Sequence, residues 1–307
     1  MVSYTEIKAS NSVINDVTAP SVAVFVGGTS GIGKLTVKAL VATGSNIRIY
    51  LIGRKSSEER SHAFIEELRV ANPKAEVIWT EGDVSLLAET KRLCEVIKSK
   101  ESRIDLFLAY YSRMLFILHL LPLLREAEAP RVVSVLGGGM ETTSLELDDI
   151  ELKKPENFGP RKVQLQVLTM NTTTLDKLAA ENPDVTFIHS WPGWVNTGNV
   201  NRGVDQGTFM SWFVWLILEP LISLFSFSDE ESAQRHLFQS TSAAFGGRGV
   251  PWSGKQGVNS QEKQENGLFL VNYKCNCTPN AKVVSALREK AQKRVWDHTQ
   301  EVLGPHL

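Results

Sequence analysis

Residues 21–33 read SVAVFVGGTSGIG, and this stretch decides the fold of the chain. Its apolar run, residues 23–26, contains β-branched valines and is typical of a strand that is buried on both faces of a parallel sheet. A turn with glycines at GxxxGxG spacing (Gly27, Gly31 and Gly33) follows directly, and residues 32–40 have helical periodicity. A strand, a glycine turn and a helix in this order allow backbone N–H groups and the positive end of a helix dipole to approach a pyrophosphate. A purely structural turn is the alternative, because glycine adopts positive φ without strain.

The next strands add evidence for a dinucleotide. Residues 46–52 (NIRIYLI) predict a second buried strand, which ends in Gly53-Arg54-Lys55 where dinucleotide-binding folds recognise the adenosine ribose. A carboxylate at this place would favour NAD. Arg54 and Lys55 instead suit a 2′-phosphate, so the sequence favours NADP(H). Residues 76–80 predict a third strand, and Asp83 and Val84 follow it.

Strand and helix patterns alternate along the rest of the chain. Helical patterns occupy residues 58–71, 85–98, 111–128 and 163–180, and strand patterns occupy 106–108, 131–136, 185–189 and 267–271. This alternation predicts right-handed βαβ crossovers. The predicted fold class is therefore α/β, a Rossmann-type doubly wound parallel sheet. A chain of 307 residues and 34.1 kDa suits a single domain, here 21–307, after an N-terminal extension of residues 1–20.

The composition limits the classes of partner. The chain has 33 Lys and Arg against 34 Asp and Glu, a formal net charge of -1 and no basic run, which argues against nucleic-acid binding. Cys94, Cys275 and Cys277 form neither a disulfide framework nor a metal-ligand pattern, so no metal is expected. Residues 1–20 lack the basic and apolar regions of a signal peptide, so a cytoplasmic location is expected.

From about Ser21 to about Asn272 the chain resembles the short-chain dehydrogenase/reductase family. The family's TGxxxGxG motif falls on residues 26–33, its adenine-contacting acid falls on Asp83, and its PG motif reads PGWVNT at residues 192–197. Within the family, the chain is similar to fungal proteins whose first strand begins with FVGxTSGIG and which carry YYSRM before an apolar helix, here residues 110–114. Many of those proteins belong to secondary-metabolite pathways.

This resemblance implies NADP(H) as cofactor and an oxidoreductase that acts on a hydroxyl or carbonyl group of a small apolar metabolite. The implied cofactor-binding residues lie in the glycine turn, at the ends of the second and third strands, and in the PG motif. They are Gly27, Thr29, Ser30, Gly31, Ile32, Gly33, Arg54, Lys55, Asp83, Val84, Pro192, Gly193, Val195 and Thr197.

The catalytic set of the family is incomplete in this chain. The family uses a serine, a tyrosine that transfers the proton, a lysine four residues later and an asparagine. Gly137 stands at the serine position, and the one YxxxK candidate, residues 158–162, begins with Phe158. Lys162 remains as a ribose contact, or else as a solvated lysine at a helix start. A phenyl ring cannot donate a proton, so hydride transfer would need another acid.

Other polar residues could take over this role. Tyr110 and Tyr111, the alternative donors, could equally pack in the following helix. His189 ends a buried strand and is expected to be structural. Glu141, Thr142, Thr143 and Ser144 follow the glycine run after the fifth strand. Lys162, Tyr110 and Tyr111 are therefore the candidate catalytic residues. A redox-silent relative, either an isomerase or cyclase or a nucleotide-binding partner protein, is the alternative function.

Two segments near the expected substrate site are unusual. Relatives have an NNAG segment and roughly two dozen further residues after the fourth strand, whereas here Ala109 leads almost directly into a helix, which predicts an open cleft on the nicotinamide side. Residues 209–227 are strongly apolar and lie within the expected substrate lid, about 198–240. They are interrupted by Glu219-Pro220 and are too short to span a membrane. They could line a pocket for an apolar substrate, form the interface of a homo-oligomer, or attach weakly to a membrane.

Overall fold

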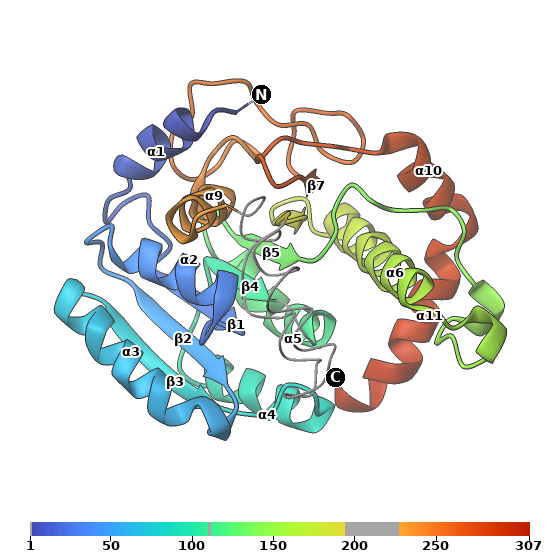
Figure 1. Ribbon diagram of the computed structural model, residues 1–307, viewed down its shortest axis with the longest axis horizontal. Helices are drawn as coiled ribbons and strands as arrows, with labels where there is room; N and C mark the ends of the chain where they lie inside the picture. Colours follow the sequence, from blue (N-terminus) through green and yellow to red (C-terminus); the bar gives the residue numbers. More distant parts are fainter. Residues whose placement is uncertain (1, 110–111, 194–226) are drawn as a thin grey trace, which may run out of the picture.

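The structure is a computed structural model, and it describes residues 2–109, 112–193 and 227–307 (Figure 1). Within these ranges, strands from along the whole chain form one parallel sheet in the order β3-β2-β1-β4-β5-β6-β7. The strands are β1 (Val22–Val26), β2 (Arg48–Gly53), β3 (Glu76–Glu81), β4 (Leu106–Ala109), β5 (Arg131–Val135), β6 (Thr186–Ser190) and β7 (Leu268–Val271). The prediction of a Rossmann-type doubly wound parallel sheet in an α/β domain is confirmed.

The strands are apolar on both faces, and helices therefore cover both faces. Phe25 and its alternate neighbours pack on one side of the sheet, while Val24 and Val26 pack on the other. Helices α1 (Tyr4–Ser12), α2 (Gly31–Val41), α3 (Glu58–Ala71) and α9 (Asp229–Thr241) supply buried side chains to the first layer. Helices α4 (Leu87–Lys98), α5 (Arg113–Arg125), α6 (Pro160–Glu181) and α10 (Ala281–Lys290) supply them to the second, and α11 (Gln292–Leu303) packs on α6. Figure 1 shows the sheet between these two layers.

The order of the strands positions the site. Val26, the last residue of β1, pairs with Ile52 of β2 on one side and with Ala109 of β4 on the other. The chain moves outward from β1 in one direction to β2 and β3, and then returns to β4 on the opposite side. Ligands of doubly wound sheets bind outside the carboxyl ends of the strands at such a switch point. The glycine turn after β1 lies at this edge.

Two segments for which the sequence predicts no helix, one N-terminal and one within the expected lid, are helical. The N-terminal extension contains α1, in which Ser3 and Glu6 form a capping box and Ile7 is fully buried. Residues 229–241, assigned in part to the lid, form α9, which packs against α1 and α2. This part of the predicted lid range is therefore core. Residues 198–226 of that range lie outside the described residues.

A buried arginine explains how the polar α9 ends inside the protein. The Arg131 side chain at the start of β5 donates hydrogen bonds to the carbonyl oxygens of Gln239 (2.9 Å), Ser242 (2.8 Å), Phe245 (3.2 Å) and Arg248 (3.0 Å). The last carbonyls of a helix have no partner within the helix, so a cation at this end satisfies them. Complete burial lowers the pKa of Arg131 to about 9. The side chain still carries its charge at neutral pH.

Because α1 belongs to the core, we expect Ile7→Ala to destabilise the protein. Ile7 is 0% exposed and lies in the same apolar cluster as Val37 and Leu237. Replacing a buried isoleucine with alanine typically lowers the free energy of unfolding by about 2–5 kcal/mol. Val17→Ala is the control, because Val17 is 91% exposed. Denaturant unfolding would measure both variants, and equal free energies of unfolding would show that α1 is only an appendage.

Candidate functional site

The glycine turn after β1 has the geometry of a phosphate-binding turn. Gly27 and Gly31 have φ values of 89° and 54°, which favour glycine, and a Cβ built on Gly27 has no atom within 4 Å. A Cβ on Gly33 would lie 2.5 Å from the Gly27 carbonyl oxygen, so this glycine allows α2 to approach the turn closely. Ser30 is the N-cap of α2, but its side chain makes no cap hydrogen bond to the helix. The turn therefore combines the positive-φ glycines and the close approach to α2 that a pyrophosphate-binding turn requires.

The ends of β2 and β3 lie beside this turn. Arg54 and Lys55 follow β2 and are exposed. Asp83 follows β3, and its Oδ1 accepts hydrogen bonds from the backbone N–H (3.0 Å) and the hydroxyl (2.8 Å) of Ser85. These hydrogen bonds lower the pKa of Asp83, with a smaller contribution from the charge of Arg54. Arg54 is thus close enough to Asp83 to act on it electrostatically, and the residues present suit an adenosine ribose with a 2′-phosphate.

The connection from β4 to α5 is very short, as the sequence predicted. Ala109 ends β4 and Arg113 begins α5. Tyr110 and Tyr111, two of the three candidate catalytic residues, lie outside the described residues. Ser112 has φ of 48°, and its hydroxyl donates a hydrogen bond to the carbonyl oxygen of Val84. The start of α5 is therefore attached to the segment that follows β3.

After β5, three consecutive glycines lie close to other parts of the chain, and at two of them no side chain fits. A Cβ on Gly138 would lie 1.9 Å from the carbonyl oxygen of His189, and one on Gly139 would lie 2.3 Å from Oγ1 of Thr278. At Gly137, where the family has a serine, a Cβ would lie 3.0 Å from Cδ2 of Leu168. The residue of α6 that faces the serine position is therefore an apolar leucine.

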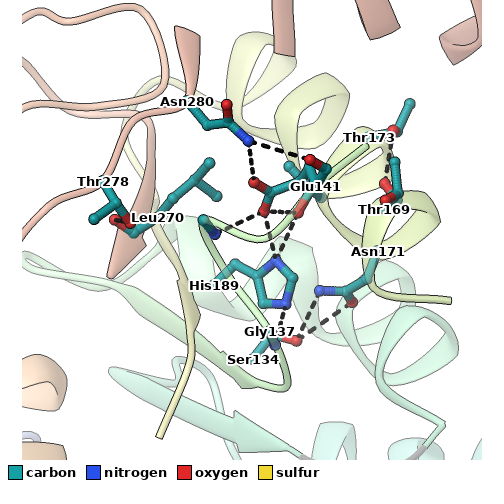
Figure 2. A network of polar contacts seen from close by, with 12 residues as sticks. Ser134, Gly137, Glu141, Thr169, Asn171, Thr173, His189, Leu270, Thr278 and Asn280 are labelled. Carbon is teal, nitrogen blue, oxygen red and sulfur yellow. Dashed lines mark hydrogen bonds and ion pairs between the residues drawn. The ribbon is translucent and has the colours of Figure 1, made fainter. Parts of the chain in front are cut away.

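A network of buried polar side chains fixes this glycine run (Figure 2). The backbone N–H of Gly137 donates to Nε2 of His189 at 3.1 Å, so in neutral His189 the proton is on Nδ1. Nδ1 lies 2.6 Å from Oγ1 of Thr172, which in turn donates to Oε1 of Glu141 at 2.8 Å. Asn280 donates to Oε2 of Glu141 at 3.0 Å. The network thus joins β5, α6, β6 and the residue before α10.

His189 is structural in this network, as expected. Burial, assisted by the charge of Arg113, lowers the pKa of His189 to about 3, so the ring stays neutral under ordinary conditions. Both ring nitrogens already have hydrogen-bond partners. Glu141 is buried as well, and its Oε1 also accepts from the backbone N–H of Gly139 at 2.9 Å. Neither side chain is therefore free to donate a proton to a substrate.

Lys162 and Phe158 lie apart from the glycine run. Lys162 is in the first turn of α6, and its Nζ forms an exposed ion pair with Oε1 of Glu146 at 3.2 Å. Leu168, which faces Gly137, lies six residues further on, roughly 9 Å along the helix axis at 1.5 Å per residue. Phe158 precedes α6 and is 68% exposed. The arrangement fits the solvated-lysine interpretation, and the structure does not bring Lys162 into the site.

The PG motif lies at the carboxyl end of β6. Gly193 has φ of 70°, and a Cβ there would lie 2.7 Å from Cβ of Tyr273. The ring of Tyr273 also packs edge-on against Trp191, with centroids 5.2 Å apart. Of the predicted residues in this motif, Pro192 and Gly193 are described, whereas Val195 and Thr197 lie outside the described residues. Sequence reasoning missed Tyr273, although its place two residues after β7 was a usable signal.

An apolar cavity of about 470 Å³ opens at the carboxyl ends of β4 and β5. Its walls come from the first turn of α5, the middle of α6 and the end of α11. Its lining residues are Leu87, Ser112, Arg113, Met114, Leu115, Leu136, Val167, Met170, Asn171, Thr174, Thr299 and Leu303. The volume is in the range of small-molecule sites, which are mostly apolar with a few polar groups. The sequence had not identified Asn171 or Arg113 as site residues.

Three further features of the described residues concern metal ligands, reactive cysteines and membrane-spanning helices. No group of three or more His, Cys, Asp or Glu side chains in these ranges could hold a metal ion. Cys94, Cys275 and Cys277 are free thiols. None of the described helices is both long and apolar enough to cross a membrane. The apolar stretch 209–226 lies outside the described residues, while Phe227 at its end packs against Tyr273 with centroids 5.8 Å apart.

Comparison with known proteins agrees with this geometry. Residues 21–107 match the family model of the KR domain. The chain is 33% identical to Oxidoreductase AN1596 of Emericella nidulans over 338 positions, which cover 99% of this chain and 98% of the relative. The alignment has 338 positions and this chain has 307 residues. At least 31 positions are therefore gaps in this chain, where only the relative has a residue.

Two further proteins are similar to the chain, one in sequence and one in fold. The short-chain dehydrogenase/reductase SAT2 of Stachybotrys chartarum is 26% identical over 92% of this chain and 91% of its own length. The solved structure of YwfH, an NADPH dependent reductase involved in bacilysin biosynthesis, has a TM-score of 0.53 over 73% of this chain and 92% of that chain, at 16% identity. This likeness shows the fold. The chain belongs to the short-chain dehydrogenase/reductase family.

Proposed function

We propose that this protein is an NADP(H)-dependent oxidoreductase that interconverts a hydroxyl and a carbonyl group on an apolar metabolite. One observation carries the proposal. A phosphate-binding turn, two exposed cations after β2 and an apolar cavity of about 470 Å³ lie at the same edge of the sheet. When bound, the cofactor would supply or accept a hydride. NADP(H) is supported by the residues present, since Arg54 and Lys55 stand where NAD-binding folds have an acid.

The residues of the chain have separate roles in this proposal. The N-terminus of α2 and the glycine turn would hold the pyrophosphate. Arg54 and Lys55 would bind the 2′-phosphate, and Asp83 and Val84 would contact the adenine. The apolar walls of the cavity would hold the metabolite and exclude water. The short connection between β4 and α5 leaves this cavity without the additional segment that the fungal relatives are expected to have there.

The alternative, a redox-silent relative, is favoured by two observations. In the described ranges no tyrosine lies on α6, and Leu168 faces the position of the missing serine. Such a protein would bind the cofactor without oxidising or reducing a substrate. Incubating the protein with NADPH and a panel of apolar ketones separates the two functions. Ketone-dependent loss of the reduced nicotinamide absorbance supports the proposed function, and tight NADPH binding without any loss supports the alternative.

We expect NADPH to bind more tightly than NADH, and Arg54→Ala to weaken this preference. Hydrogen bonds to charged groups contribute about 1.5–3 kcal/mol, which corresponds to about a tenfold to hundredfold change in Kd. Arg60→Ala is the matched control. Arg60 is exposed on the neighbouring α3, and its replacement with alanine removes the same charge outside the proposed cofactor site. Fluorescence titrations with both nucleotides would measure the effect. Equal Kd values for the two nucleotides in the parent protein would refute the assignment of Arg54.

A further inference from the structure

One hydroxyl group that lines the apolar cavity has no hydrogen-bond partner among the described residues. It belongs to Thr174 of α6, which is 4% exposed. The other threonines of this helix, Thr169, Thr172 and Thr173, all form side-chain hydrogen bonds, and Figure 2 shows the bond from Thr173 to Thr169. A buried hydroxyl without a partner is unfavourable. A ligand that fills the cavity must therefore supply a partner for Thr174.

Thr174 lies below the carboxyl edge of the sheet, away from the expected reacting carbonyl. Leu168 of α6 faces Gly137, the family's serine position, which follows β5. One turn later, Nδ2 of Asn171 donates to Oγ of Ser134 within β5 at 3.2 Å, so α6 runs down from this edge. Thr174 comes six residues after Leu168, roughly 9 Å along the helix axis at 1.5 Å per residue. An oxygen that bonds to Thr174 is therefore not the oxygen that reacts beside Gly137.

The other two hydroxyl groups of the described cavity lining already use their protons. Ser112 donates to the carbonyl oxygen of Val84, and Thr299 of α11 donates to the carbonyl oxygen of Val295 at 2.8 Å. Thr174 is therefore the lining hydroxyl that is free to donate. A single neutral hydroxyl among aliphatic and sulfur-containing side chains does not compensate for the desolvation of a charged group. The group that suits Thr174 is an uncharged oxygen.

We infer that the apolar metabolite of the proposed reaction carries a second, uncharged oxygen, a hydroxyl or a carbonyl, which accepts a hydrogen bond from Thr174. This inference rests on the proposed function and specifies its substrate class. A ligand with only hydrocarbon at this point would leave the hydroxyl buried without a partner, and sites with such a group reject analogues that lack the matching oxygen. Thr174 is then a specificity-determining residue, while the apolar walls contribute affinity for either kind of ligand.

The test exchanges a hydroxyl for a methyl group in the ligand and in the protein. Naphthol and methylnaphthalene, substituted at the same ring position, serve as probes of nearly equal shape, and calorimetry measures their Kd values with the parent protein and with Thr174→Val. We expect the variant to shift the ratio of the two Kd values about threefold to tenfold toward methylnaphthalene, the net effect of one neutral hydrogen bond. Thr173→Val is the matched control, because Thr173 is the neighbouring buried threonine and donates to Thr169. Circular dichroism would establish that each variant is folded.

The outcomes distinguish this inference from the proposed function. A ratio that is unchanged in Thr174→Val, an equal shift in Thr173→Val, or a parent protein that binds neither probe would overturn the oxygen site. Loss of hydride transfer to ketones with a single oxygen in Thr174→Val would place Thr174 at the reacting carbonyl and would also overturn it. If the ratio shifts as expected but the parent binds no NADPH, the oxygen site stands and the proposed function fails. If ketones oxidise NADPH while the ratio does not shift, only the oxygen site fails.

Discussion

Replacing Gly33 with valine should abolish binding of NADPH while most of the fold remains. A Cβ at this position would lie 2.5 Å from the Gly27 carbonyl oxygen and 3.0 Å from Cα of Gly28, and both are backbone atoms that cannot rotate away. The turn must therefore shift, and its backbone N–H groups would no longer point toward the pyrophosphate. We expect Kd for NADPH to rise at least a hundredfold, about 2.8 kcal/mol, since each factor of ten is about 1.4 kcal/mol.

Gly159→Val is the matched control for this prediction. Gly159 has φ of -178° and ψ of 149°, an extended conformation that valine adopts easily, and a Cβ there has no atom within 4 Å. Fluorescence titration gives the affinity, and circular dichroism reports whether each variant is folded. If Gly33→Val bound NADPH as tightly as the parent, the glycine turn would have only a structural role.

The second large effect concerns turnover, which we expect to be slow in the parent protein. Reducing a ketone needs a proton donor within hydrogen-bond reach of the developing alkoxide. Phe158 cannot donate and is exposed, and Gly137 lacks the hydroxyl that would orient the carbonyl. A general acid contributes about a hundredfold to ten-thousandfold. Since enzymes typically turn over at about 10 s⁻¹, we expect about 0.1 s⁻¹ or less.

Steady-state rates of NADPH oxidation with apolar ketones would test this expectation. Turnover of tens per second would contradict it and would point to a donor outside the family's usual position. Tyr273 would then be the first residue to examine, because it is the described tyrosine that packs against the PG motif. In that case Tyr273→Phe should reduce turnover strongly, whereas Tyr50→Phe, at a tyrosine whose hydroxyl bonds to Glu101, would be the control.

Much of the fold could be predicted because the central strands are short, apolar runs between glycines and polar turns. The pairing of β1 with β2 and β4 follows from the parallel, doubly wound order alone. Helix α9 could not be predicted in this way. Its sequence, DEESAQRHLFQST, is largely polar, yet most of its residues after the first turn are buried because α1 covers it and Arg131 satisfies its last carbonyls. Partners that lie so far away in the sequence leave no pattern of apolar residues within the helix itself.

The cofactor side of the site could be predicted from the sequence because its residues follow one another closely in the chain at a fixed spacing. The substrate side could not be predicted, because it is assembled from segments that lie far apart in the sequence. Glu141, Thr172 and His189 form one network only when β5, α6 and β6 pack together. Arg113 stood in a quoted motif, but nothing local indicates that it lines a cavity with Asn171, a residue 58 positions away. Lys162 was predicted from the spacing of a motif, and in the structure its Nζ forms an exposed ion pair with Glu146.

The measurement that tests the proposed function most directly is a single-turnover transfer of deuterium. The protein, in excess, is mixed with NADPH that carries deuterium at the transferable position, together with a panel of apolar ketones. Mass spectrometry of the products detects transfer even when turnover is slow. We predict an alcohol that carries one deuterium and an equal amount of NADP⁺. Bound NADPH that stays fully labelled and reduced with every ketone would contradict the proposal and identify the protein as a redox-silent member of its family.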